Sequence, residues 1–340
     1  MNRRIVTLTA ALVPVIVLGI LGSVVKVPFV ALGPGPTFDT LGDFDDNDVV
    51  AITGVDVDEV SGQLNMTTVA VRDNLTVFDA FGFWISRRHG IAPREQVYPP
   101  DLTKEQVQQH NAAEFRQSED AAALAALNYL GKPMLLTVAA VAEDGPSNGL
   151  LKESDQIIAV QGRTVATAQD VQKAVAELDP GSTVVIDVVR DGEPEAVEVI
   201  LGTRPDDDSR AYLGVSAQQE SDVDFDIEFN LADIGGPSAG LMFSLAVIDK
   251  LTPGPLTGGD FIAGTGTISP DGEVGPIGGI RYKLIAADEA GADTFLVPAR
   301  NCAEAVENAP DGVRLVKVET LSGAVDALNS LNAGGEAPSC

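Results

Sequence analysis

The amino-acid sequence predicts a mixed α/β (α+β) chain of several domains behind a single N-terminal transmembrane helix. Three observations lead to this fold class. Residues 5–25 are an uncharged apolar run, residues 132–202 hold closely spaced strand patterns, and beyond Tyr212 strand patterns alternate with helical ones. At 340 residues, the chain is long enough for two or three domains.

The apolar run Ile5–Val25 contains no charged residue. As a helix that rises about 1.5 Å per residue, it would cover about 30 Å, the thickness of a bilayer's hydrocarbon core. Arg3 and Arg4 precede the run and Lys26 alone follows it, so the N-terminus is expected in the cytoplasm and the rest outside it. A cleaved signal peptide is the alternative, but the run is long for one and no A-x-A-like site follows. We therefore expect an uncleaved single-pass anchor in the cell membrane.

Residues 27–131 are predicted to form a membrane-proximal α/β segment. Gln63–Val71 alternates apolar and polar residues as a strand does, and Thr76–Ser86 is a candidate amphipathic helix that holds the single tryptophan, Trp84. A capping box at Thr103–Gln106 starts an alanine-rich helix that is expected to contain a break. No catalytic constellation is visible here, and we expect a spacer or an oligomer contact.

The strand-rich segment 132–204 contains the turn Val141–Leu151, followed by Ser154–Gly162. These stretches resemble a bacterial PDZ domain, although many members have Gly-Asp where Ser154 begins the second stretch. The resemblance implies that a peptide binds as an added strand, often with its terminal carboxylate held by backbone amides. Leu130-Gly131 is one candidate for the carboxylate loop, and a plain helix C-cap is the alternative for that glycine. A PDZ fold that only packs against its neighbour is the other alternative.

The motif Gly235-Gly236-Pro237-Ser238-Ala239-Gly240 precedes a long apolar helical run. Because proline suits the first helical position, a helix is predicted over Pro237–Leu251 with Ser238 in its first turn. Backbone N–H groups are unpaired there and the dipole end is positive, so the hydroxyl would lie beside donors for a developing oxyanion. A glycine-rich turn capped by a serine is the alternative for this motif alone.

A second stretch contains Gly264-Thr265-Gly266-Thr267-Ile268 and then Gly275-Pro276-Ile277-Gly278-Gly279, shortly before Lys283. Together with the serine motif, it closely resembles the proteolytic domain of the Lon proteases, over about residues 212–331. The resemblance implies a catalytic dyad of Ser238 and Lys283, with the hydroxyl of Thr265 holding the lysine. Many Lon proteases have an acidic residue three positions before the serine, where this chain has a glycine.

A lysine can take the serine proton only when its amine is neutral, whereas the free side chain has a pKa of about 10.4. Lowering that pKa to about 7–8 requires about 3–5 kcal/mol, which burial can mostly supply. The backbone N–H of Ser238 and that of the neighbouring Gly236 are predicted to form the oxyanion site. The alternatives are a solvated surface position for Lys283 and a plain strand position for Thr265.

Composition excludes several classes of function. The chain has 22 basic and 50 acidic residues, a formal charge of −28, which argues against nucleic acid or an anionic membrane surface as a partner. Cys302 and Cys340 give no disulfide framework and no CxxC metal site, and a bridge between them stays an alternative to a mobile tail over residues 333–340. His89 and His110 lie far upstream of the serine and are expected to face solvent, which disfavours a Ser-His-Asp triad.

The sequence thus predicts a membrane-anchored serine endopeptidase that acts outside the cytoplasm on protein or peptide segments, with no cofactor and no metal. No GxxxxGK[ST] loop occurs, so ATP-independent cleavage is expected. The alternatives are a catalytically inactive PDZ scaffold or adaptor at the membrane, and a peptidase for small peptides. A homo-oligomer is implied by the resemblance alone. The expected domains are the anchor (1–26), the membrane-proximal segment (27–131), the PDZ domain (132–204), the proteolytic domain (212–332) and a flexible tail (333–340).

Overall fold

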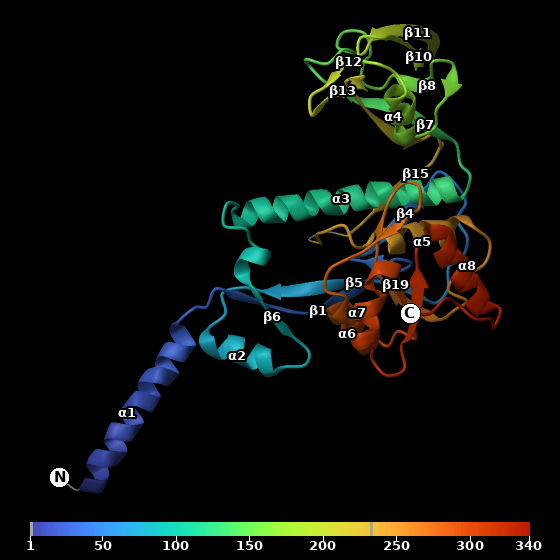
Figure 1. Cartoon of the computed structure of the whole chain (residues 1–340). Helices are drawn as coiled ribbons and strands as arrows, with labels where there is room; N and C mark the ends of the chain where they lie inside the picture. Colours follow the sequence, from blue (N-terminus) through green and yellow to red (C-terminus); the bar gives the residue numbers. More distant parts are fainter. Residues whose placement is uncertain (1–2, 232–233) are drawn as a thin grey trace. The chain divides into compact units, whose positions relative to one another are not determined.

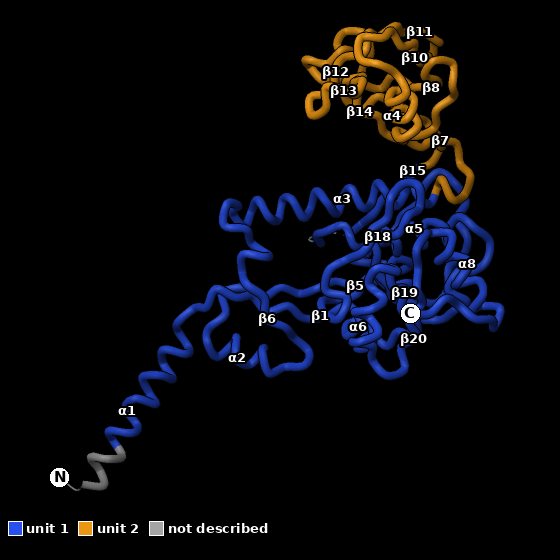
Figure 2. Tube along the Cα trace, viewed as in Figure 1, with its two compact units in different colours: residues 1–126, 226–340 blue, residues 127–225 orange. Residues whose placement is uncertain are grey.

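A computed structural model describes residues 3–231 and 234–340, with side chains from residue 9 onward. The chain divides into two compact units (Figure 2). The main unit combines Met1–Ala126 with Asp226–Cys340, and the inserted unit is Leu127–Phe225. In the order of the sequence, the inserted unit therefore interrupts the main one.

The main unit is built on a mixed six-stranded sheet in the order β20-β19-β16-β5-β1-β6 (Figure 1). The four strands from β20 to β5 are parallel to one another, whereas β1 is antiparallel to both β5 and β6. The strands are β1 (Phe29–Asp39), β5 (Gln63–Arg72), β6 (Gly90–Pro93), β16 (Phe261–Gly264), β19 (Thr294–Pro298) and β20 (Arg314–Val318).

At the centre of this sheet, a strand from the N-terminal part of the chain pairs with a strand from the C-terminal part. Gln63 of β5 pairs with Phe261 of β16, and Met66 pairs with Gly264. Residues 27–131 are therefore not a segment separate from the proteolytic domain, as the predicted boundaries have them, since they supply three of the six strands. Local periodicity identifies a strand but not its partner, which is why the sequence did not reveal this pairing.

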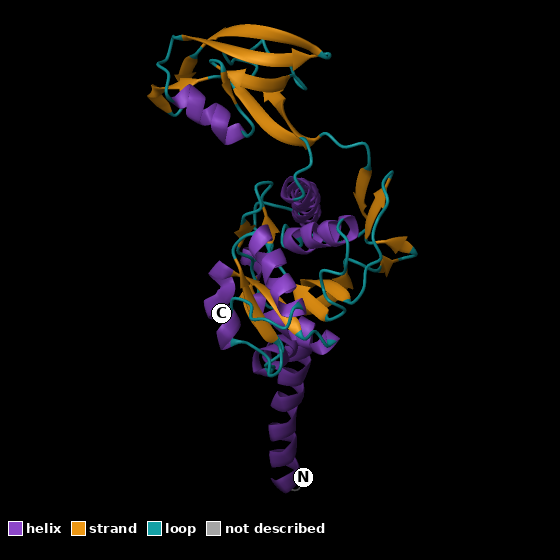
Figure 3. Cartoon of the chain, turned by 90° about the vertical axis from the view of Figure 1, so that its right-hand side faces the viewer, coloured by secondary structure: helices purple, strands orange, loops and turns teal. Residues whose placement is uncertain are grey.

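Helices pack around the main sheet (Figure 3). Among them, α5 is buried from Gly240 to Lys250, as its apolar character on all sides requires. Its start differs from the predicted Pro237 because Ala239 is the N-cap. The helices are α1 (Arg3–Val24), α2 (Val77–Ile85), α3 (Lys104–Tyr129), α5 (Gly240–Leu251), α6 (Ile280–Ala290), α7 (Cys302–Glu307) and α8 (Leu321–Asn332), with 3₁₀ turns η1 (Arg94–Gln96) and η2 (Ala299–Asn301).

Local start signals are confirmed. Thr76 caps α2 through a reciprocal capping box with Asp79. At the start of α3, the N–H of Thr103 donates to Gln106 Oε1 at 2.8 Å, and the N–H of Gln106 donates to Thr103 Oγ1 at 3.2 Å. The expected break in α3 is absent. The main unit also contains the short strands β2 (Asp43–Phe44), β3 (Asn47–Asp48), β4 (Val50–Thr53), β15 (Asp226–Phe229), β17 (Thr267–Ile268) and β18 (Val274–Gly275).

The inserted unit is a second sheet, in the order β11-β10-β8-β7-β14, with the short helix α4 (Ala168–Ala176) and its own apolar core. Asp191 and Gly192 have positive φ angles of 52° and 83°, as a tight hairpin between β10 and β11 requires. The remaining strands are β7 (Met134–Val141), β8 (Gln156–Val160), β9 (Arg163–Thr164), β10 (Thr183–Arg190), β11 (Glu193–Ile200), β12 (Gly202–Arg204), β13 (Asp207–Tyr212) and β14 (Val215–Ser221).

Strand β14 differs from its predicted place. The boundary at residue 212 assigned it to the proteolytic domain, but it pairs with β7 from Val215–Val141 to Ser221–Met134. The inserted unit therefore extends to Phe225, beyond the predicted end at residue 204. A strand joins the sheet that offers a free edge, which sequence order does not specify.

The predicted membrane span, Ile5–Val25, falls partly on residues whose side chains lie outside the described part of the chain. The backbone forms the single helix α1 over Arg3–Val24. Among the described residues, no helix combines the length and the apolarity needed to cross a bilayer. The membrane anchor therefore stays a prediction.

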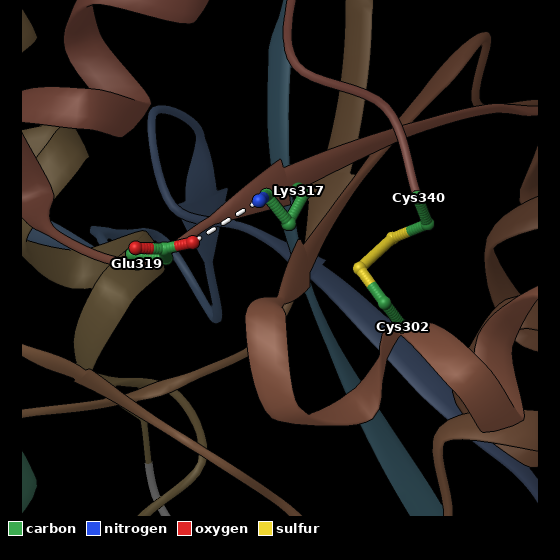
Figure 4. The surroundings of a disulfide bond; sticks show 4 residues. All are labelled: Cys302, Lys317, Glu319 and Cys340. Atoms are coloured by element: carbon green, nitrogen blue, oxygen red, sulfur yellow. Dashed lines mark ion pairs between the residues drawn. A yellow bond between two sulfur atoms is a disulfide. The ribbon is translucent and has the colours of Figure 1, made fainter.

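The C-terminal tail is attached to the main unit, so the prediction of a mobile tail over residues 333–340 is wrong. Cys340 forms a disulfide with Cys302, the first residue of α7 (Figure 4). The N–H of Lys317 donates to the carbonyl of Pro338 at 2.8 Å, so the tail pairs with β20. Because β20 is an edge strand, its backbone groups are available to the tail.

This disulfide should contribute measurably to stability. It joins residues 38 apart, and a loop of that length lowers the entropy of the unfolded chain by an amount worth about 4 kcal/mol. We expect Cys302→Ser to lower the free energy of unfolding by about 2–4 kcal/mol in urea titrations. Dithiothreitol should lower the free energy of unfolding of the original chain by the same amount. It should leave that of the Cys302→Ser/Cys340→Ser variant unchanged. Equal stability of all three proteins would contradict a structural role for the bridge.

Candidate active site

The predicted serine lies in a turn directly before α5 rather than in its first helical turn. Its carbonyl oxygen explains this position. That oxygen accepts hydrogen bonds from the N–H of Gly266 and from Thr265 Oγ1, both at 2.9 Å. The backbone at Ser238 is therefore held by the chain between β16 and β17, and the helix begins only at Gly240.

Lys283 lies in the first turn of α6, and only 2% of its surface is exposed. Its Nζ lies 2.8 Å from Ser238 Oγ, 2.9 Å from Thr265 Oγ1 and 2.8 Å from the carbonyl oxygen of Thr67. The structure thus brings the three predicted residues Ser238, Lys283 and Thr265 together. The alternative of a solvated surface lysine is wrong. Sequence analysis missed Thr67, on β5, because a backbone carbonyl carries no residue-type signal.

Counting protons at Nζ shows what the neutral amine does. The hydroxyl of Thr265 uses its single proton on the carbonyl of Ser238, so its oxygen can only accept from Lys283. The carbonyl of Thr67 can also only accept. A neutral amine has two N–H donors, and these two acceptors use both. Its lone pair must then face Ser238 Oγ, which is the arrangement for removing the serine proton.

Burial lowers the pKa of Lys283 from 10.5 to about 7. Desolvation is the cause, because removing the ammonium from water disfavours its charged form. Among the residues that the structure describes, no carboxylate is hydrogen-bonded to Nζ to offset that penalty. The amine is therefore substantially neutral near pH 7, which a lysine base requires.

One of the two predicted oxyanion donors has another partner. The N–H of Gly236 donates to the carbonyl of Asn111 on α3 at 2.9 Å, so it is already used. Within the described ranges, no acceptor is bound to the backbone N–H of Ser238 or Ala239, which leaves these two as available donors. A Cβ added at Gly235 would lie 2.7 Å from Cβ of Asn111. This close approach to α3 explains why a glycine stands where many Lon proteases have an acidic side chain.

A cavity of about 970 Å³ opens beside the serine. Strand β1 and the β2–β3 hairpin line it with Phe38 and Phe44. The centroids of these two rings lie 5.3 Å apart in an edge-to-face arrangement. Met66 of β5 and Phe115 of α3 add further apolar surface. Eight of the sixteen residues that line the cavity come from the segment predicted to be a spacer, so that segment contributes to the site.

The two histidines do not line this cavity. His110 is exposed, with Nε2 3.4 Å from Glu114 Oε1. His89 is half-buried and does not face solvent as predicted, since its ring packs on Phe83 and its Nδ1 lies 3.2 Å from Ser86 Oγ.

The inserted unit has a candidate groove of its own. A cavity of about 460 Å³ is lined by α4, by Arg204–Asp206 at the end of β12, and by the chain from Arg210 of β13 to Val215, the first residue of β14. Strand β14 is an edge of its sheet, so its outer backbone groups are open to an added strand. The candidate carboxylate loop Leu130-Gly131 is a helix C-cap instead. There the N–H groups of Gly131 and Lys132 donate to Asn128 and Leu127 at the end of α3.

The pKa of Lys283 predicts a specific dependence of stability on pH. Because this pKa falls from 10.5 to about 7 on folding, the unfolded chain binds more protons between these values, and stability rises with pH there. Between pH 7.5 and 9.5, we expect the original chain to gain about 2–3 kcal/mol relative to Lys283→Met, measured by urea unfolding. The exposed-lysine variant Lys173→Met is the control and should follow the original chain. Parallel pH curves for all three would contradict the lowered pKa.

Comparisons with known proteins match two stretches of the chain. Residues 112–201 match the family model of the PDZ domain, and residues 215–329 match that of the Lon protease (S16) C-terminal proteolytic domain. The Lon protease of Haemophilus influenzae is 32% identical over 135 residues, which are 32% of this chain and 17% of that protein. Lon protease 2 of Herpetosiphon aurantiacus is 36% identical over 108 residues (31% and 13%), and Lon protease 2 of Bacillus subtilis 32% over 108 residues (31% and 19%). The chain spans less than a fifth of the length of these relatives. It therefore combines a PDZ domain with a proteolytic domain of the Lon (S16) type.

Proposed function

We propose that this chain is a membrane-anchored serine endopeptidase that cleaves extended protein segments outside the cytoplasm without ATP. The observation that carries the proposal is the environment of Lys283, whose buried amine contacts Ser238 Oγ at 2.8 Å and has a pKa lowered to about 7. The match of residues 215–329 to a Lon-type proteolytic domain supports the same chemistry.

The contacts imply the order of steps. Ser238 Oγ attacks the carbonyl carbon of the scissile peptide bond while its proton passes to the neutral Nζ of Lys283. The negative oxygen of the tetrahedral intermediate accepts hydrogen bonds from the N–H groups of Ser238 and Ala239. The ammonium then gives the proton to the departing amine, leaving an ester on the serine. Water hydrolyses this ester, and Lys283 again takes and returns the proton, so each cleaved bond consumes one water.

The proposed substrates are protein segments that are already extended. The cavity beside Ser238 is lined by side chains such as Phe38, Phe44 and Phe115, which suit an apolar substrate side chain next to the cleaved bond. The sequence has no GxxxxGK[ST] loop to bind the phosphates of a nucleotide. A peptidase that lacks an unfolding motor is limited to unstructured chains, loops and tails.

The PDZ unit is proposed to hold such segments. Strand β14 offers a free edge beside the groove formed with α4, and an extended peptide can add to that edge by main-chain hydrogen bonds. Apolar side chains of α4, among them Val171 and Val175, line this groove and can receive a peptide side chain. Binding in this way selects an exposed terminus or tail rather than a folded surface.

Two observations support a place outside the cytoplasm. The Cys302–Cys340 disulfide is of a kind that persists in oxidising compartments. The uncharged run Ile5–Val25 follows two arginines, and large apolar side chains of α1 such as Leu18 and Ile20 are exposed. An apolar helix surface of this kind is stable in lipid, and the arginines favour a cytoplasmic N-terminus.

The activity should depend on the dyad in a defined order. Without nucleotide, the chain is expected to cleave casein, at a rate that rises about tenfold per pH unit below the lysine pKa and then levels off. Ser238→Ala should show no cleavage. Lys283→Arg should lose about 10²–10⁴-fold in kcat, since guanidinium keeps its proton. Thr265→Val should lose less, about tenfold, because it removes an acceptor that orients the amine.

The control for these variants is Lys173→Met, which changes an exposed lysine on α4 and should leave the rate unchanged. Circular dichroism establishes that each variant is folded. A folded Lys283→Arg protein that cleaves at the original rate would contradict the lysine base. Failure of the original chain itself to cleave casein would favour the inactive-scaffold alternative.

The proposed topology has its own test. A protease added to intact cells should digest the residues after Lys26 and leave a cytoplasmic tag at the N-terminus protected. The positive charge before the apolar run is the physical reason. Digestion only after the cells are permeabilised would show that the orientation is reversed, whatever the outcome of the casein assay.

A further inference from the structure

Helix α2 is apolar and yet none of its residues is buried. Phe78, Phe81, Trp84 and Ile85 are exposed, with 72% of the surface of Trp84 accessible. The rings of Phe81 and Trp84 lie 6.1 Å apart, so the aromatic side chains form one patch. A helix with this many apolar side chains is normally covered by protein or lipid. A contiguous patch of exposed apolar side chains marks an interaction surface.

Helix α2 lies next to the C-terminal end of α1 (Figure 1). A Cβ added at Gly22 would lie 2.7 Å from ring atoms of Phe78, so the two helices are in direct contact. The N–H of Val27 also donates to the carbonyl of Leu75 at 2.9 Å, which ties the residues after α1 to those before α2. The exposed face of α2 therefore begins where the proposed membrane anchor ends.

The charges around this patch are basic, in contrast to the formal charge of −28 on the whole chain. Lys26, Arg72 and Arg87 are exposed, and within the described residues none of the three has an ion pair. The pKa of Asp79 on α2 is lowered by hydrogen bonds from Thr76 and by Lys26, so this carboxylate stays charged, and the three basic residues outnumber it. A local basic border next to exposed aromatic residues is complementary to a bilayer with anionic headgroups, a partner that the net charge of the sequence appeared to exclude.

We propose that α2 is a membrane-docking helix that inserts Phe78, Phe81 and Trp84 into the interface of an anionic bilayer. Lys26, Arg72 and Arg87 would then contact lipid phosphates. Aromatic side chains favour this interfacial depth because the headgroup region accepts both their apolar rings and their polar edges. The inference rests on the membrane location proposed above.

Docking through α2 would give the main unit a second attachment besides α1. Strand β1 starts beside α2 and carries Phe38 at its far end, where it lines the cavity next to Ser238. A fixed α2 would therefore hold the active site at a set distance from the bilayer. The substrates would then be segments that reach this distance, such as the membrane-proximal parts of anchored or secreted chains.

Trp84 is the only tryptophan, so its fluorescence reports on α2 alone. The full chain is placed in nanodiscs that contain phosphatidylglycerol, with or without bromine on the upper acyl chains. We expect brominated lipid to remove more than half of the Trp84 emission and acrylamide to quench it weakly. In the matched control, Trp84→Phe/Ile200→Trp, the tryptophan replaces an exposed residue of β11 in the inserted unit. The control should be quenched by acrylamide and not by brominated lipid.

The charge of the border is tested in the same discs. In the original chain, bromine should quench Trp84 more strongly as the fraction of anionic lipid rises. In Arg72→Gln/Arg87→Gln, the quenching of Trp84 should be weaker and should not depend on that fraction. Equal responses of the two proteins would overturn the contact between these arginines and the phosphates.

Each remaining outcome has one meaning. Trp84 open to acrylamide and unaffected by bromine would show that α2 faces water, and Trp84 shielded from both would show that a protein surface, such as a second copy, covers it. Either result overturns docking while the chain still elutes with the discs. Elution apart from the discs would overturn anchor and docking together. Casein cleavage by the same samples reports separately on the peptidase.

Discussion

The desolvation of one amine is the constraint that the rest of the main unit has to satisfy. Nζ of Lys283 is removed from water and held by Thr67, Thr265 and Ser238, which belong to β5, to the chain after β16 and to the turn before α5. The lowering of its pKa from 10.5 to about 7 corresponds to roughly 5 kcal/mol that disfavours the ammonium. Only a rigid surrounding fold can maintain such burial, and α5, buried from Gly240 to Lys250, and the central sheet provide it.

The same requirement explains why distant segments share one sheet. Strand β5 supplies the carbonyl of Thr67 to the lysine and pairs in parallel with β16, which leads into Thr265. Strand β1, on the other side of β5, lines the cavity with Phe38. The site is therefore a property of the whole main unit. The inserted unit has its own core and its own groove, which fits a binding role separate from the chemistry.

Net charge was an incomplete guide to partners. The total of −28 describes solubility and long-range repulsion, but a surface responds to the charges within about a Debye length, roughly 8–10 Å. Around α2 these include Lys26, Arg72 and Arg87, against the carboxylate of Asp79, beside exposed aromatic rings. The acidic character of the whole chain and a local basic border around α2 are thus compatible.

The sequence by itself determined the features that a few neighbouring residues encode. The serine motif, Lys283 and Thr265 have recognisable side chains, and Thr76 and Thr103 start helices by contacts within one turn. Tertiary structure alone decided what depends on backbone groups and distant partners. In the folded chain, β5 pairs with β16, and β14 joins the sheet of the inserted unit. Cys340 forms a disulfide with Cys302 of α7, and the N–H of Gly236 donates to the carbonyl of Asn111. A carbonyl or N–H is the same in every residue, so its partner is known only once the chain has folded.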